Sequence, residues 1–207
     1  MTWLRTEPDE PSITMNSNTH LNTPPAAIQA TQYDAVAKGF HWVMAALLIS
    51  VFALGLYMQG LPFSPDKLKF YSWHKWAGIC VLSLVAFRLI WRLTHRPPVM
   101  PNDMPAWQKI AAHAAHLALY LLMFAIPVSG WLMSSAKGVT TVLFGLWPLP
   151  DLVARDRELG DALQNLHWYL NVSLALFVAI HVLAVFKHHF LDKDDILRRM
   201  LPGIRSR

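Results

Sequence analysis

The sequence has little charge and almost no cysteine. Only 15% of its 207 residues are Asp, Glu, Lys or Arg, and Cys80 is the single cysteine. Soluble domains usually carry about 25% charged residues. One cysteine excludes an intrachain disulfide framework and a thiolate-bound metal cluster. Hydrophobic residues make up 54% of the chain and the mean hydropathy is +0.30, which indicates a membrane protein.

The net charge of +5 does not indicate a nucleic-acid-binding protein. The basic residues are scattered at the edges of apolar runs, where membrane topology requires them, and they do not gather on one face. We therefore expect membrane lipid, and no nucleic acid, among the partners.

Four long apolar stretches dominate the chain, at about 34–58, 73–93, 110–133 and 163–186. Each exceeds the roughly 20 residues that a helix needs to cross a bilayer. None alternates with a period of two, which argues against strands. The sequence predicts an all-α membrane protein with a bundle of four transmembrane helices.

The remaining segments set the predicted boundaries. Residues 1–32 are polar and rich in Pro, Thr, Asn and Ser, which predicts a disordered tail. Residues 33–202 form the predicted helical domain, and 203–207 a short C-terminal tail. Asp34 is placed to cap the first helix, and Pro97 follows the end of the second.

The distribution of Lys and Arg predicts the orientation. Twelve of the 18 belong to the N-terminal tail, the second connection, the C-terminal tail and the adjoining helix ends, and six belong to the other side. The positive-inside rule then places both termini in the cytoplasm.

Two further segments contain many apolar residues but cannot cross the membrane. Val142–Pro150, in the long connection 134–160, is expected to lie in the interface or over the outer end of the bundle. The segment 191–201 mixes apolar and charged residues, which predicts an amphipathic end on the membrane surface.

Histidines are the candidate functional residues, because ionisable groups are costly at membrane depth. His167 and His181 are fourteen residues apart in the fourth stretch. A helix would place them on one face, within about 40° and roughly 21 Å apart along its axis. Two haems stacked across a bilayer need two ligands on one helix in this arrangement, and neutral imidazole is a common ligand of haem iron.

Each haem needs a second ligand at the same depth on another helix. His74 begins the second stretch as His167 begins the fourth, so these two are expected at one level. For His181, the depth fits both His41 and His116, and the sequence pattern leaves that choice open.

Zinc is the alternative for a histidine cluster, but it requires three or four ligands that converge on one point. The spacing of fourteen residues separates the ligands. A transporter or channel that uses the histidines for protons or metal ions, without haem, is a further alternative.

Several segments resemble the bacterial cytochrome b561 family of di-haem inner-membrane proteins, the group that includes superoxide oxidase. The resemblance covers about residues 33–202 and rests on Phe40-His41-Trp42, Trp73-His74-Lys75, Arg88-Leu89-Ile90-Trp91-Arg92-Leu93, Ala112-His113-Ala114-Ala115-His116, Leu119-Tyr120-Leu121-Leu122, His167, His181, Lys187-His188-His189-Phe190 and Leu197-Arg198-Arg199-Met200-Leu201-Pro202.

The resemblance implies a multi-pass protein of the bacterial inner membrane with two haem b groups that exchanges electrons with ubiquinone. It favours His41 with His181 as the cytoplasmic ligand pair and His74 with His167 as the periplasmic pair. His116 then becomes a candidate for the quinone end, with His188 as a second.

The expected function is therefore that of a membrane oxidoreductase. It would pass electrons between a periplasmic donor, such as superoxide or a redox partner protein, and ubiquinone. A cytochrome b anchor subunit of a larger quinone-linked dehydrogenase is the alternative with the same cofactors. The sequence assigns no catalytic residue beyond the haem ligands.

Overall fold

The structure is a computed structural model that describes residues 32–101 and 104–203. The tails predicted at 1–32 and 203–207 lie almost entirely outside the described residues.

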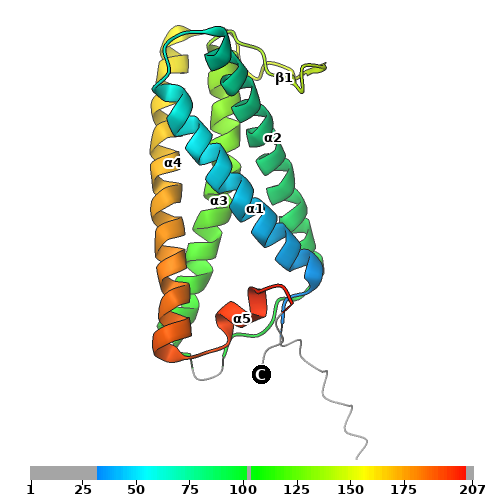
Figure 1. Cartoon of the computed structure of the whole chain (residues 1–207), viewed down its shortest axis with the longest axis vertical. Helices are drawn as coiled ribbons and strands as arrows, with labels where there is room; N and C mark the ends of the chain where they lie inside the picture. Colours follow the sequence, from blue (N-terminus) through cyan, green and yellow to red (C-terminus); the bar gives the residue numbers. More distant parts are fainter. Residues whose placement is uncertain (1–31, 102–103, 204–207) are drawn as a thin grey trace, which may run out of the picture.

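Four long helices form the body of the protein (Figure 1). They are α1 Ala35–Gln59, α2 Pro65–Thr94, α3 Ala106–Ala136 and α4 Arg157–Phe186. All four are long and apolar enough to cross a membrane, which confirms the predicted all-α bundle of four spanning helices.

Two helices begin well before the apolar runs that predicted them. α2 begins at Pro65, where the side chain of Ser64 accepts a hydrogen bond from the Lys67 N–H. α4 begins at Arg157, where Asp156 caps the helix in the same way. Capping side chains set these starts, so the helices extend past the hydrocarbon-sized segments.

Asp34 caps α1 as predicted and also ties it to α2. The Ala37 N–H donates to Asp34 Oδ1 over 2.8 Å, and Trp91 Nε1 donates to both carboxylate oxygens at 3.2 and 3.1 Å. Burial acts to raise the pKa of Asp34, but the hydrogen bonds from Ala37, Trp91 and Val36 favour the charged form and hold the pKa below its ordinary value.

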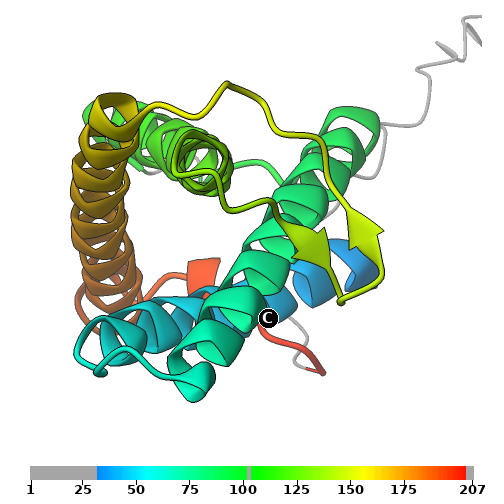
Figure 2. The same cartoon turned by 90° about the horizontal axis from the view of Figure 1, so that it is seen from above.

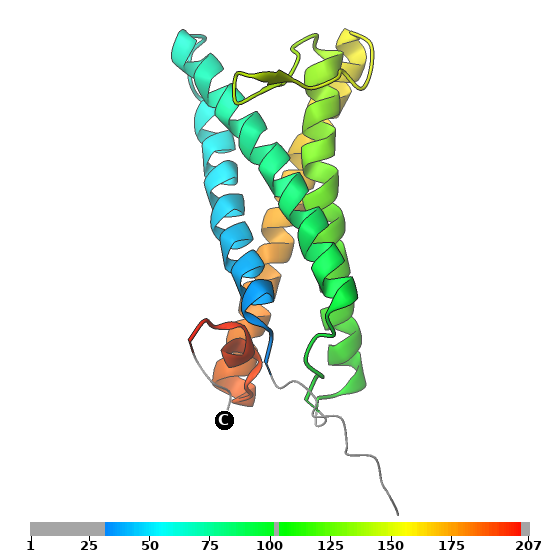
Figure 3. The same ribbon diagram turned by 90° about the vertical axis from the view of Figure 1, so that its right-hand side faces the viewer.

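The helices pack as two pairs. α3 packs along α4, α1 packs along α2, and α2 crosses obliquely to meet α3 (Figures 2 and 3). α4 has little contact with α1 or α2. Side chains from these three helices therefore face one another across the interior of the bundle. Pro127 lies within α3 and does not end it.

A small hairpin, which the sequence did not predict, lies in the connection between α3 and α4. Strands β1 Val142–Leu143 and β2 Trp147–Pro148 pair antiparallel around a turn with positive φ at Phe144 and Gly145. Trp76 of α2 donates to the Val142 carbonyl over 2.7 Å. The hairpin therefore packs over one end of the bundle, which we call the hairpin end (Figure 1).

The opposite end carries the first and the last described residues, Gln32 and Gly203 (Figure 1), and we call it the termini end. After α4 the chain forms a π-helical turn, η1 Lys187–Asp192, and a short helix, α5 Ile196–Met200. This segment, predicted as amphipathic, folds back onto α1, where Trp42 Nε1 donates to the Met200 carbonyl over 3.0 Å.

Candidate functional site

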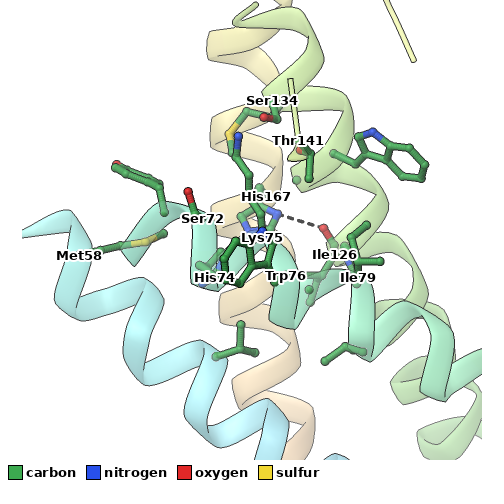
Figure 4. A pocket seen from close by; sticks show the side chains of 18 of the residues that line it. Met58, Ser72, His74, Lys75, Trp76, Ile79, Ile126, Ser134, Thr141 and His167 are labelled. Atoms are coloured by element: carbon green, nitrogen blue, oxygen red, sulfur yellow. Dashed lines mark hydrogen bonds between the residues drawn. The ribbon is translucent and has the colours of Figure 1, made fainter. Parts of the chain in front are cut away.

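At the hairpin end, His74 of α2 faces His167 of α4 across the interior. Their ring centroids are 6.3 Å apart and the ring planes are inclined by 77°. Figure 4 shows both side chains directed into the same pocket. The structure thus brings together the two histidines that the sequence placed at one level.

A cavity of about 900 Å³ surrounds this pair and is lined by all four long helices. Toward the middle of the bundle its walls are apolar, with Leu48, Val51, Phe52, Met123 and Leu174. Toward the hairpin polar side chains also line it, among them Gln59, Ser72, Lys75, Lys137 and Gln164. Such a cavity suits a large, mainly apolar ligand with a polar edge.

The ring of His167 is held by α3. Its Nδ1 lies 3.1 Å from the Ile126 carbonyl oxygen and 2.9 Å from Ser129 Oγ (Figure 4 marks the contact with Ile126). A carbonyl oxygen only accepts hydrogen bonds, so Nδ1 carries the proton and Nε2 keeps a free lone pair. His167 is therefore in the tautomer that binds a metal through Nε2.

Each imidazole of this pair also rests on a glycine of a neighbouring helix. A Cβ built on Gly55 of α1 would lie 3.1 Å from His74 Cε1, and one on Gly130 of α3 would lie 3.1 Å from His167 Cε1. Larger residues would push the rings out of place. Gly78 of α2, by contrast, has open space at the Cβ position.

His74 retains a ring nitrogen without a well-formed hydrogen bond. Its Nδ1 is buried and no partner in the described residues meets it with acceptable geometry, although the backbone of Val51 is close enough to influence the ring. Buried polar atoms are normally paired.

At the termini end, three imidazoles meet. His181 of α4 lies 6.4 Å from His41 of α1 and 5.5 Å from His116 of α3, measured between ring centroids. Both candidates that the sequence left open for His181 are thus adjacent to it.

A cation stands among these three imidazoles. Arg88 of α2 donates through Nε to the Tyr120 hydroxyl over 3.0 Å, and its NH2 group lies 3.3 Å from His41 Nδ1. Arg88 is close enough to His41, His116 and His181 to act on all three electrostatically.

His188 lies beyond this group, in η1. Its Nδ1 is 2.7 Å from Asp194 Oδ2 and 3.0 Å from Asp192 Oδ2, and Lys187 Nζ lies 2.6 Å from the same Asp192 oxygen. Its ring is held within an ion-pair cluster of the C-terminal segment, and its role at a quinone end stays a prediction.

The other histidines of the described chain lie outside these groups. His95 is exposed and stacks on Trp91 at 3.8 Å, and the exposed His113 contacts the Lys109 carbonyl.

The two predicted pairs fit a haem iron. Imidazole nitrogens bind metal ions at roughly 2 Å and the ring centre lies roughly 1 Å behind, so two rings on opposite sides of one iron are roughly 6 Å apart. His74 with His167 and His41 with His181 have nearly equal separations, 6.3 and 6.4 Å. The cavity around His74 and His167 agrees with a ligand at the first pair.

Comparisons with known proteins identify the family of the chain. The sequence model of the family described as prokaryotic cytochrome b561 matches residues 32–203. The chain belongs to the prokaryotic cytochrome b561 family. It is 38% identical to "Cytochrome b561 homolog 2" of Escherichia coli (strain K12), over 82% of this chain and 91% of that protein. It is 29% identical to "Probable superoxide oxidase CybB" of Yersinia pestis, over 84% of this chain and 98% of that protein.

Membership of the cytochrome b561 family establishes the class of the protein. It is a cytochrome b oxidoreductase of the bacterial inner membrane, with several membrane-spanning helices, and b-type haem is its cofactor.

Sequence reasoning missed the residues that support the histidines. Ser129 and Ile126 orient His167, and Arg88 contacts His41. Arg88 contributes to the predicted topology and to the family resemblance, but the sequence predicted no functional role for it. Its position, more than one turn inside the apolar stretch, was the feature that could have marked it as functional.

Proposed function

We propose that this cytochrome b561 protein carries two haem b groups and passes electrons between a donor at the hairpin end and ubiquinone at the termini end. One observation supports this above all others. α4 presents His167 and His181 in two opposed imidazole pairs of nearly equal separation, 6.3 and 6.4 Å. Fourteen residues of helix place these pairs roughly 21 Å apart, on opposite sides of the bilayer centre.

We assign His74 and His167 as the ligands at the hairpin end, and His41 and His181 at the termini end. His116 is the weaker candidate there, for two reasons. Its ring lies 5.5 Å from that of His181, less than the separation of roughly 6 Å expected across one iron. It also stands on α3, which packs closely along α4 and leaves little room for a macrocycle, whereas α1 and α2 have little contact with α4.

Each haem, when bound, supplies a one-electron carrier, and the residues of the chain supply its position and surroundings. Ser129 and Ile126 fix the ring of His167 through Nδ1, so that Nε2 would be free to bind the metal. Gly55 and Gly130 admit the two imidazoles of this pair at close range. The apolar side chains of the cavity would limit the contact of a bound haem with water, which tunes its reduction potential.

We place the termini end in the cytoplasm, because it gathers most of the Lys and Arg residues. Ubiquinone would bind at this end. His116 would be available to it, since its ring adjoins His181 while the assigned ligand pair excludes it.

The donor would approach from the periplasm at the hairpin end. Superoxide is the candidate that the name of the Yersinia pestis relative suggests. Lys75 and Lys137 line the cavity on this side, and cations attract an anionic donor. Lys75 is held by the Val139 carbonyl, and Lys137 contacts Asp161 and Gln164.

The test begins with haem quantification and a reduced-minus-oxidised spectrum of the purified chain. We expect two haem b per chain, and substitution of His74 or His167 by Ala should remove one haem and leave the other. One haem or none in the unmodified chain would refute the proposal.

The acceptor and donor need a separate measurement. The protein, reconstituted with ubiquinone, should form ubiquinol when superoxide is generated, and this activity should fall with loss of the hairpin-end haem. If small donors fail and a periplasmic protein co-purifies and reduces the haems, the chain is an anchor subunit instead.

A further inference from the structure

Arg88 is a cation within a membrane-spanning helix, and no acidic residue of the described chain neutralises it. It lies six residues before Thr94, the end of α2, which is roughly 9 Å of helix. No carboxylate among residues 32–101 and 104–203 lies within ion-pair distance of its guanidinium. Charged residues at such depth are costly, and they are normally paired or mark a binding site.

The hydrogen-bond partners of the Arg88 guanidinium are two neutral side chains. Nε donates to the Tyr120 hydroxyl, and NH2 approaches His41 Nδ1. Tyr120 comes from α3 and His41 from α1, so the guanidinium is held between helices at the termini-end imidazoles. This is a fixed, positively charged donor group whose counter-ion is missing from the described protein.

We propose that Arg88 is the anion-binding residue of the termini-end site, where it pairs with a carboxylate of the haem that His41 and His181 hold. This inference rests on the proposed function. Haem b carries two propionate carboxylates, and guanidinium binds carboxylate with two parallel hydrogen bonds. Tyr120 orients the guanidinium from the other side.

The contact with His41 indicates that the guanidinium of Arg88 changes its partner when haem binds. Arginine only donates hydrogen bonds, so the observed contact requires Nδ1 of His41 to accept, and the proton of the neutral ring then sits on Nε2. Binding a metal through Nε2 requires that proton to move to Nδ1, and Arg88 must then leave Nδ1. A propionate is the partner that takes the guanidinium. His167 needs no such change, because its Nδ1 already faces a carbonyl.

The experiment uses the full chain with His74→Ala and His167→Ala, so that only the termini-end site binds haem. This protein is reconstituted with haem b and with haem b dimethyl ester, in which both carboxylates are blocked. We expect haem b to bind about tenfold more tightly than the ester, the usual effect of a charge-assisted hydrogen bond. Arg88→Gln should abolish this preference, and Arg88→Lys should retain part of it.

Arg92→Gln is a comparison variant, since it removes another cation one turn further along α2. Because Arg92 also acts electrostatically on His116, Arg96→Gln, which removes an exposed cation beyond the end of α2, is made beside it. Arg96→Gln should leave the preference for haem b intact. Equal binding of haem b and the ester, or a preference that survives Arg88→Gln, would overturn the inference. If the starting chain binds neither compound, the ligand assignment of the proposed function fails and the inference fails with it.

A second measurement avoids reconstitution, in case the variants fold poorly without haem. In the chain with all histidines, loaded during synthesis, Arg88→Gln should lower the midpoint potential of one haem and leave the other unchanged, because a nearby positive charge favours the reduced form. Unchanged potentials at full haem content would contradict the role of Arg88.

Discussion

The two ends of the bundle hold their histidines in different ways. At the hairpin end, two imidazoles face each other, each rests on a glycine, and His167 is fixed in the metal-binding tautomer by α3. At the termini end, three imidazoles share the space with Arg88. The first site is shaped for one pairing alone. The second has a third imidazole and a cation, which suits the quinone binding that we propose for this end.

The largest expected effect tests which of the three termini-end imidazoles hold the proposed haem. His41→Ala and His181→Ala should each remove the termini-end haem and leave one haem per chain, because a bis-imidazole site loses an axial ligand. His116→Ala should keep two haems. Haem quantification and reduced-minus-oxidised spectra measure this directly. If His116→Ala loses a haem and His41→Ala keeps two, His116 is the haem ligand and His41 is not.

A smaller effect tests whether the hairpin end is shaped by glycine. Gly55→Ala and Gly130→Ala each place a Cβ 3.1 Å from a ligand ring, which forces a shift in a packed site. Overpacking of this kind costs about 1–3 kcal/mol, so we expect about tenfold weaker retention of one haem. Haem loss to a competing apoprotein measures it.

Gly39→Ala in α1 is the control for these variants, since its Cβ meets open space and Gly39 does not line the cavity. It should retain haem as well as the unmodified chain does, with a small gain from helix propensity. Equal haem loss in all three variants would show that contact with the imidazoles is not the cause.

Removing a hydroxyl should have a milder consequence at the same end. Ser129→Ala deletes one contact of His167 Nδ1 and leaves the Ile126 carbonyl in place. One hydrogen bond is worth about 1 kcal/mol, so haem dissociation at the hairpin end should accelerate about fivefold. Stopped-flow haem transfer measures the rate. No change would mean that Ile126 alone orients the ring.

The smallest effect concerns the termini end without touching a histidine. The pKa of Asp34 is held below its ordinary value, so its stabilising contribution is complete above that ordinary value and is lost as the pH falls through the lowered pKa. Asp34→Ala should cost about 1 kcal/mol of stability at neutral pH.

Asp34→Asn should keep most of the helix cap and lose this part of the pH dependence. Melting midpoints in detergent from about pH 7 to about pH 3 measure both variants. If Asp34→Asn loses stability in acid as the unmodified chain does, Asp34 does not contribute to the pH dependence of stability.

The fold was largely readable from the chain, because spanning helices require long apolar runs and the protein has four of them. The starts of α2 and α4 that the apolar runs predicted, at about 73 and 163, were wrong by about two turns. The helices begin at Pro65 and Arg157, because capping residues outside the hydrocarbon determine where they start. The β1–β2 hairpin was missed, because two-residue strands leave no periodic signal.

The sequence by itself determined the helical bundle and the two levels of histidine along α4, since both follow from the period and rise of a helix. It left open which helix stands opposite His181, because depth does not specify a neighbour. Only the tertiary structure placed α1 and α2 across the interior from α4, while α3 packs along it. It also brought Arg88 to His41 and Gly130 to His167, contacts between residues far apart in the chain that helix packing alone creates.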